Sequence, residues 1–209
     1  MSFKGQIEAK CPAGCEPFTT EVWSFVNGSQ SEDLRNAVLF RELNLIICPH
    51  CEKPFLPETT YVYYEPAQEL LAFVMPESYR AEEQRWRGKM HEDFVAYRKA
   101  LKDLPVTVEP EVFFGVEGLA ELLEKLDYGG EEREVMEAVA GELGLSIYRV
   151  SPHYARANSI PDALPFEGKT ATAASVRSGL EKLLAANDRL SAYADFLKTF
   201  KELPPARPG

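Results

Sequence analysis

The four cysteines of the chain form two close pairs, and this arrangement constrains the fold more than any other feature. The pairs are Cys11-Pro12-Ala13-Gly14-Cys15 and Cys48-Pro49-His50-Cys51, and 32 residues separate them. Two pairs on short turns are the usual ligand pattern of a structural zinc site, in which each pair supplies two thiolates to a tetrahedral ion. We therefore expect one structural zinc ion per chain, bound by Cys11, Cys15, Cys48 and Cys51.

Other chemistry could use the same cysteines. Cys-Pro-His-Cys is also the dithiol sequence of a strongly oxidising thioredoxin-like protein, where a helix N-terminus lowers the pKa of the first thiol. Here a helix beginning at Cys48 would meet Pro54 in its second turn, which argues against a redox helix. A thiol-disulfide oxidoreductase or another enzyme that uses Cys48 and Cys51, disulfide bonds and an iron centre stay open as alternatives. We expect His50 to face solvent.

Strand-like segments surround both cysteine pairs. Residues 3–10 and 19–26 flank the first pair, residues 43–47 and 55–64 flank the second, and residues 69–75 return as a further strand. Residues 1–76 are therefore predicted to form a zinc-ribbon-like antiparallel sheet, with the metal between two hairpin turns. Such a small sheet buries little apolar surface, so we expect metal binding to contribute to its folding.

The same residues resemble a known family, the CpXC domain. The resemblance rests on the two cysteine pairs, on Glu21-Val22-Trp23 with Val26-Asn27, on Val38-Leu39-Phe40, on Tyr64-Glu65-Pro66 and on Met75-Pro76. It covers residues 1–76 and continues more weakly from Gly118-Leu119 to about Leu145. The chain differs from the family in having three residues inside the first pair and Glu52 where the family has glycine. The resemblance implies a metal site and no reaction.

The remainder of the chain is predicted to be mostly helical. One amphipathic helix after Pro76 is indicated by apolar residues at helical spacing, namely Trp86, Met90, Phe94, Tyr97, Leu101 and Leu104. Two further helices are expected on either side of residues 127–130, with Gly144 capping the second. Prolines predict a connection over residues 151–171, followed by a helical stretch from residue 173 to 203 with a break near Asn187-Asp188.

These patterns predict an α+β fold in which the antiparallel β part precedes a mostly helical part. The expected divisions are a CpXC-like zinc-ribbon domain at 1–76, a helical extension packed on it at 77–150, and a connection with a C-terminal helix at 151–209. No apolar run approaches the roughly 18 residues that span a bilayer, and no signal peptide is evident. We therefore expect a cytoplasmic protein without a membrane segment.

Function is predicted mainly by exclusion. The net charge is −10 and no stretch rich in Lys and Arg occurs, so a zinc ribbon that binds nucleic acid ranks third. His50, His91 and His153 lie in no ligand or nucleophile motif, and the polar cluster around Ser151 is expected on an exposed loop. The sequence thus favours a noncatalytic, zinc-stabilised interaction module over an enzyme. We expect an unidentified protein partner or self-association, with contacts from the exposed members of one aromatic set: Trp23, Phe25, Tyr61, Tyr63 and Tyr64.

Overall fold

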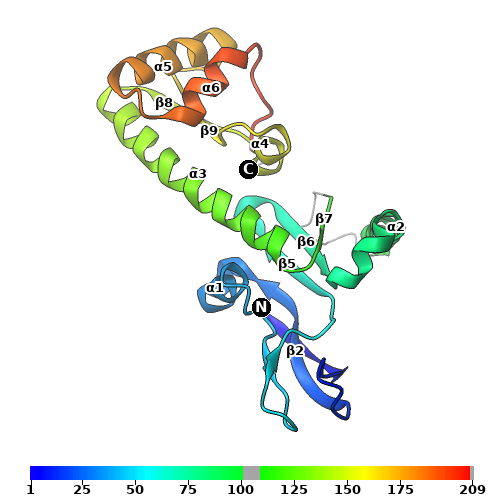
Figure 1. Ribbon diagram of the computed structural model, residues 1–209. Helices are drawn as coiled ribbons and strands as arrows, with labels where there is room; N and C mark the ends of the chain where they lie inside the picture. The colour runs from blue at the N-terminus through cyan, green and yellow to red at the C-terminus, as the bar shows by residue number, and fades with distance from the viewer. Residues whose placement is uncertain (101–108, 208–209) are drawn as a thin grey trace. The chain divides into compact units, whose positions relative to one another are not determined.

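The structure is a computed structural model that describes residues 1–100 and 109–207 (Figure 1). The chain divides into two compact units, Met1–Glu124 and Lys125–Gly209. Both units contain helices and strands, which confirms the predicted α+β class. The predicted domain boundaries after residues 76 and 150 stay predictions. In the described part of the chain, no helix is both long enough and apolar enough to cross a membrane.

The elements of the first unit are, in chain order, β1 (Phe3–Ala9), β2 (Phe18–Asn27), η1 (Gly28–Gln30), α1 (Glu32–Leu39), β3 (Ile46–Ile47), β4 (Pro54–Phe55), β5 (Tyr61–Glu65), η2 (Pro66–Gln68), β6 (Leu70–Met75), η3 (Glu77–Glu82), α2 (Glu83–Ala100) and β7 (Glu111–Phe114). The helix α3 (Glu117–Glu142) begins in this unit and ends in the second. The second unit continues with β8 (Ser146–Arg149), α4 (Pro152–Asn158), β9 (Ala163–Phe166), α5 (Ala173–Ala186) and α6 (Ser191–Thr199).

The main sheet of the first unit has five strands in the order β1-β2-β5-β6-β7. The pairs β1-β2 and β5-β6 are antiparallel hairpins, whereas β2-β5 and β6-β7 are parallel. The sheet is therefore mixed: the predicted antiparallel pairing is observed in both hairpins, but it was wrong for β2 and β5, which pair in parallel. Parallel neighbours need a long crossover, and the segment between β2 and β5 supplies one because it contains α1 and the second cysteine pair.

The two cysteine pairs lie at the turns of two hairpins. Strands β1 and β2 flank the first turn, and their register runs from Phe3 opposite Phe25 to Ala9 opposite Phe18. The short strands β3 and β4 flank the second turn. The strand predicted over residues 55–64 is instead split into β4 and β5, and Pro57 lies in the interruption, where a missing N–H removes a ladder donor.

The amphipathic helix predicted after residue 76 is observed as η3 followed by α2. Trp86 and Met90 pack on an apolar cluster formed by Met75, Val112 and Phe114, and the Trp86 ring also stacks on Tyr79 at 4.3 Å. Phe94 is buried. Of the other predicted stripe residues, Leu101 and Leu104 lie outside the described residues, as does the side chain of Tyr97. Trp86 and Met90, from the predicted apolar face of the helix, therefore pack on residues of β6 and β7 in the main sheet.

A single helix, α3, replaces the two helices that were expected on either side of residues 127–130. Gly129 and Gly130 lie inside it. Each interior glycine costs a helix about 1 kcal/mol relative to alanine, which is too little to end it where no proline follows. The helix does end at the predicted glycine: Gly144 has φ of 68°, and Leu145 N–H donates to the carbonyl of Ala140 in a Schellman motif.

In the second unit, α5 packs on β9 and on α6, and these elements share a buried core that includes Leu180, Leu183 and Tyr193. The predicted break near Asn187-Asp188 is confirmed, because α5 ends at Ala186 and α6 begins at Ser191. The polar segment at Ser151 was expected on a loop, but Ser151 is the N-cap of α4 and accepts a hydrogen bond from the N–H of Tyr154 at 3.3 Å. The proline-rich segment predicted as a connection therefore still contains a short helix, α4, and a short strand, β9.

Candidate metal centre

The four cysteine sulfurs converge at one point between the two hairpin turns. All four Sγ atoms lie within 4.8 Å of one another. The Sγ atoms of Cys11 and Cys51, which come from different hairpins, are 3.7 Å apart. A disulfide bond is only about 2.05 Å long, and none of the four cysteines is in one. The structure therefore brings together the complete set of residues that the sequence singled out.

The geometry of the four sulfurs fits a tetrahedral metal ion. A zinc–sulfur bond of about 2.3 Å gives a tetrahedron whose sulfur–sulfur edge is roughly 3.8 Å. The distance between Cys11 and Cys51 is close to this value, and the spread of the remaining distances is compatible with it. Each sequence-local pair thus supplies two donors to a single four-sulfur set.

An apolar shell surrounds this set. Cys48 is fully buried and Cys11 is 7% exposed, whereas Cys15 and Cys51 are half-buried. Phe18 and Phe55 pack beside the sulfurs and meet edge to face with their ring centroids 6.3 Å apart. Such a shell restricts access of water to the donors and lowers the local dielectric. The centre is thus the core of this end of the first unit.

The turn around Cys48 favours a thiolate. Burial alone would raise the pKa of the Cys48 thiol, but backbone N–H groups of His50 and Cys51 donate to the sulfur and lower its pKa to about 6. Hydrogen bonding to Cys51 is the main cause that raises the pKa of Cys15 to about 12. The opposite directions of the two pKa shifts mean that Cys48 loses its proton more readily than Cys15. A divalent cation would compensate the charge and displace the remaining protons.

The two turns differ in where the backbone enters the left-handed region. In the first turn Gly14 has φ of 79°, and its N–H donates to the carbonyl of Cys11 at 3.0 Å. In the second turn Glu52 has φ of 59°, and its N–H donates to the carbonyl of Cys48 at 2.9 Å. The first turn has one residue more between its cysteines than the second. Its left-handed residue, Gly14, stands before the second cysteine of the pair, whereas Glu52 stands after it. The position of Glu52 is one that glycine adopts without strain.

His50 is exposed and is not among the grouped donors. Its ring meets Phe18 edge to face at 6.3 Å. The expectation that it faces solvent is confirmed. Among the residues that the structure describes, the four cysteines are the one group of His, Cys, Asp and Glu side chains arranged to hold a metal.

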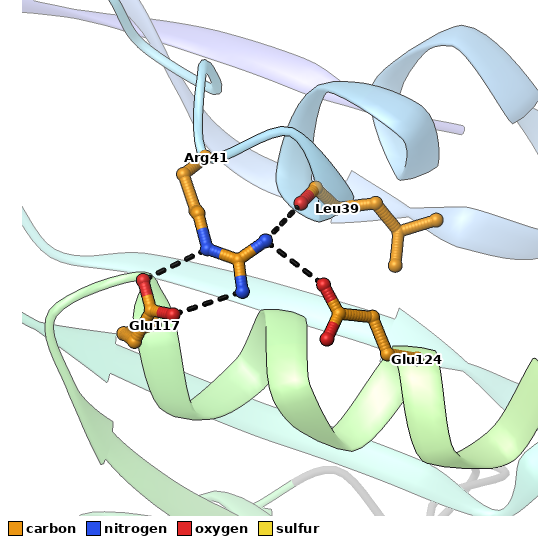
Figure 2. A network of polar contacts seen from close by, with 4 residues as sticks. All are labelled: Leu39, Arg41, Glu117 and Glu124. Carbon is orange, nitrogen blue, oxygen red and sulfur yellow. Dashed lines mark hydrogen bonds and ion pairs between the residues drawn. The ribbon is translucent and has the colours of Figure 1, made fainter.

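An arginine network fixes the segment that leads to the second hairpin (Figure 2). Arg41 follows α1, and its guanidinium donates to both carboxylate oxygens of Glu117 at 2.8 Å. It also donates to Glu124 at 2.9 Å and to the carbonyl of Leu39 at 2.7 Å. Arg41 therefore joins the end of α1 to the first turns of α3. Nothing in the local sequence pattern distinguishes this arginine from other surface charges.

The aromatic residues of the sheet separate into two groups. Tyr61 and Tyr63 are buried, and the hydroxyl of Tyr63 donates to Glu65 at 2.6 Å. These two tyrosines therefore offer no contact surface. Trp23, Phe25 and Tyr64 are half-buried, and Phe25 stacks on Phe3 with ring centroids 5.2 Å apart. Phe3 is 55% exposed and was not among the predicted contacts, although its place opposite Phe25 follows from the hairpin register.

A family model described as CpXC protein matches residues 9–139, which is well over half of the chain. No significant match was found among curated proteins or among solved structures. The match includes both cysteine pairs, the strands β2, β5, β6 and β7 of the main sheet and most of α3, whereas only the last residue of β1 falls within it. The chain therefore belongs to the CpXC family.

Proposed function

We propose that this CpXC protein is a noncatalytic interaction module whose first unit is stabilised by one zinc ion bound to Cys11, Cys15, Cys48 and Cys51. The observation that supports the proposal is the convergence of four sulfurs within 4.8 Å inside an apolar shell. The donor set consists entirely of soft thiolates in a closed arrangement, which is typical of structural zinc. Zinc-finger peptides, which are much smaller than this unit, bind structural zinc with an apparent ~10–16 kcal/mol at pH 7.

The alternative function is a thiol oxidoreductase, and the lowered pKa of Cys48 favours it. Two observations weigh against this alternative. The Cys48 side chain is fully buried, so a substrate disulfide cannot reach it without movement of the hairpin. The residues after Cys51 form the strand β4 instead of a helix, so no helix dipole activates the dithiol. A thiolate at Cys48 serves metal binding equally well.

The interaction surface that we propose is the aromatic strip formed by Phe3, Trp23, Phe25 and Tyr64. Its members lie on neighbouring strands, and Lys4 Nζ sits 5.0 Å above the Trp23 ring. Partly exposed aromatic side chains on a rigid sheet offer contact area at a low cost in conformational entropy. A protein that keeps its thiols reduced for metal binding suits a reducing compartment, which supports a cytoplasmic location.

Native mass spectrometry of protein purified without added metal or reductant tests the proposal. We expect one zinc per chain in the wild type, and loss of both zinc and the fold of the first unit in Cys48→Ser. The matched control is His50→Ser, which lies in the same turn and should retain the metal. A metal-free mass that is short by two or four hydrogens would show disulfides and would move the redox alternative to first place.

A further inference from the structure

Strand β1 ends the main sheet and leaves one edge open. It pairs with β2 along its whole length, and no other described strand pairs with it. Lys4, Gln6 and Glu8 are exposed along this strand, whereas Gly5 and Ile7 are half-buried. An open edge presents unpaired backbone N–H and C=O groups, which can pair with a further strand.

A side chain next to β2 shows which backbone groups of β1 face this open edge. Asn44 bonds to both backbone groups of Trp23: its Oδ1 accepts from the N–H at 2.7 Å and its Nδ2 donates to the carbonyl at 3.0 Å. The backbone of Trp23 therefore points away from β1. Because Trp23 lies opposite Lys4, this pair is one of the non-hydrogen-bonded pairs of the hairpin.

The alternation of an antiparallel pair extends this result along β1. Residues two positions apart have the same orientation, so the N–H and C=O groups of Lys4, Gln6 and Glu8 all point to the open edge. Gly5 and Ile7 direct theirs to β2. A new strand can therefore form hydrogen-bonded pairs only with the three exposed residues.

A second copy of β1 is complementary to this edge in one register. If a two-fold axis passes beside Gln6, Gln6 pairs with Gln6 of the second copy, and Lys4 pairs with Glu8 of the second copy on both sides. The half-buried face then places Gly5 opposite Ile7, which leaves room for the larger side chain. Shifting the register by one pair in one direction would place Lys4 opposite Lys10. In the single chain, neither Lys4 nor Glu8 has an ion-pair partner among the described residues.

We propose that two copies of the chain associate through antiparallel pairing of their β1 edges, centred on Gln6, into one continuous sheet. This inference rests on the proposed function, because it names a second copy as the partner and because β1 leads directly into Cys11. The contact involves only a short strand from each copy, which places it among small and transient interfaces. The association is therefore weak and depends on protein concentration.

The first test is a sedimentation-velocity series over increasing concentrations of the zinc-loaded protein. We expect the wild type to shift from monomer to dimer, and Gln6→Pro to stay monomeric at every concentration. Proline removes a donor that faces the open edge and leaves the bonds to β2 intact, so this edge position tolerates it. Gln6→Thr is the matched control, since it keeps the N–H, and should dimerise like the wild type.

The second test fixes the register by exchanging charges. Lys4→Glu or Glu8→Lys alone places two like-charge pairs across the axis and should weaken the dimer roughly tenfold. The double variant Lys4→Glu/Glu8→Lys restores opposite charges and should recover dimerisation. This test decides the question even if Gln6→Pro fails to fold.

The zinc content of each sample separates the two proposals. A zinc-loaded wild type that is monomeric at all concentrations would overturn this inference and leave the proposed function standing. Dimerisation of folded Gln6→Pro, or single charge variants that dimerise like the wild type, would overturn it as well. A wild type that contains no zinc but shows the expected variant pattern would overturn the metal proposal and support the edge pairing.

Discussion

Replacing Glu52 with glycine is expected to tighten metal binding by the cysteine cluster. Glu52 has φ of 59°, in the left-handed region that costs a residue with a Cβ roughly 1–2 kcal/mol. Glycine removes this strain but loses roughly 0.5–1 kcal/mol more conformational entropy when the turn orders. With the middle of each range, the net gain is about 0.75 kcal/mol. Because folding of the turn and metal binding are coupled, this gain lowers the metal dissociation constant roughly two- to fivefold.

Two matched variants separate the backbone effect from the charge effect. Glu52→Ala removes the carboxylate but keeps the strained conformation, so its zinc affinity should match that of the wild type. Gly14→Ala reverses the experiment in the other turn: Gly14 has φ of 79° and an added Cβ would meet nothing within 4 Å. Its penalty is therefore conformational, and zinc affinity should fall by a similar factor.

The assay is competition for zinc against a chromophoric chelator of known affinity at constant pH and ionic strength. The expected order of affinity is Glu52→Gly, then wild type together with Glu52→Ala, then Gly14→Ala. Equal gains in Glu52→Gly and Glu52→Ala would refute the reasoning, because they would show that the lost charge and not the backbone controls affinity.

Two further predictions concern residues outside the cysteine cluster, one in each unit. Gly179→Ala should destabilise the second unit by roughly 1–3 kcal/mol in urea unfolding followed by circular dichroism, because the added Cβ would lie 2.5 Å from the carbonyl oxygen of Pro165. Gly141→Ala is the control, since its Cβ meets nothing within 4 Å; it should stabilise by about 1 kcal/mol, and equal effects of the two variants would contradict the close approach. Arg41→Lys should lower the melting temperature of the first unit, measured by tryptophan fluorescence, because lysine cannot form the two-pronged contact with Glu117. The loss should shrink at high salt, and an unchanged melting temperature would show that this contact does not stabilise the unit.

The metal cluster was predictable because its information is local. Each cysteine pair lies within one short turn, and the flanking alternation identifies β1 and β2 as strands, so both half-sites follow from residues close in sequence. The αL positions at Gly14 and Glu52 are also short-range features. The resemblance to the CpXC family had marked the position of Glu52 as one where glycine is expected, and its φ value gives the physical reason.

The parallel pairings were not predictable in the same way. Whether β2 pairs with β5, and β6 with β7, depends on how crossovers place strands that are distant in sequence. The burial of Tyr61 and Tyr63 illustrates a related limit. Alternation along β5 shows that the two tyrosines share a face, but it does not show that η1 covers Tyr63, whose hydroxyl occupies the space where a Cβ on Gly28 would lie.

The continuous helix α3 shows a third limit. Paired glycines usually mark the end of a helix, and the sequence-based prediction followed that rule at Gly129-Gly130. The free-energy cost of two glycines in a helix is small enough that the flanking helical turns keep the helix continuous. The left-handed Gly144 provides a real stop, because its conformation allows carbonyls at the helix end to be satisfied.

The placement of the second cysteine pair inside a crossover has a consequence for the order of folding. The β1-β2 hairpin closes a short loop, so it can form within microseconds and present Cys11 and Cys15 as a ready half-site. The parallel pairing of Phe25 with Val62 closes a much longer loop. Closing that loop costs more chain entropy before its stabilising contacts form. A metal ion captured first by the hairpin would tether the incoming Cys48 turn and shorten that loop. In this order of events the ion acts as a nucleation point for the parallel half of the sheet.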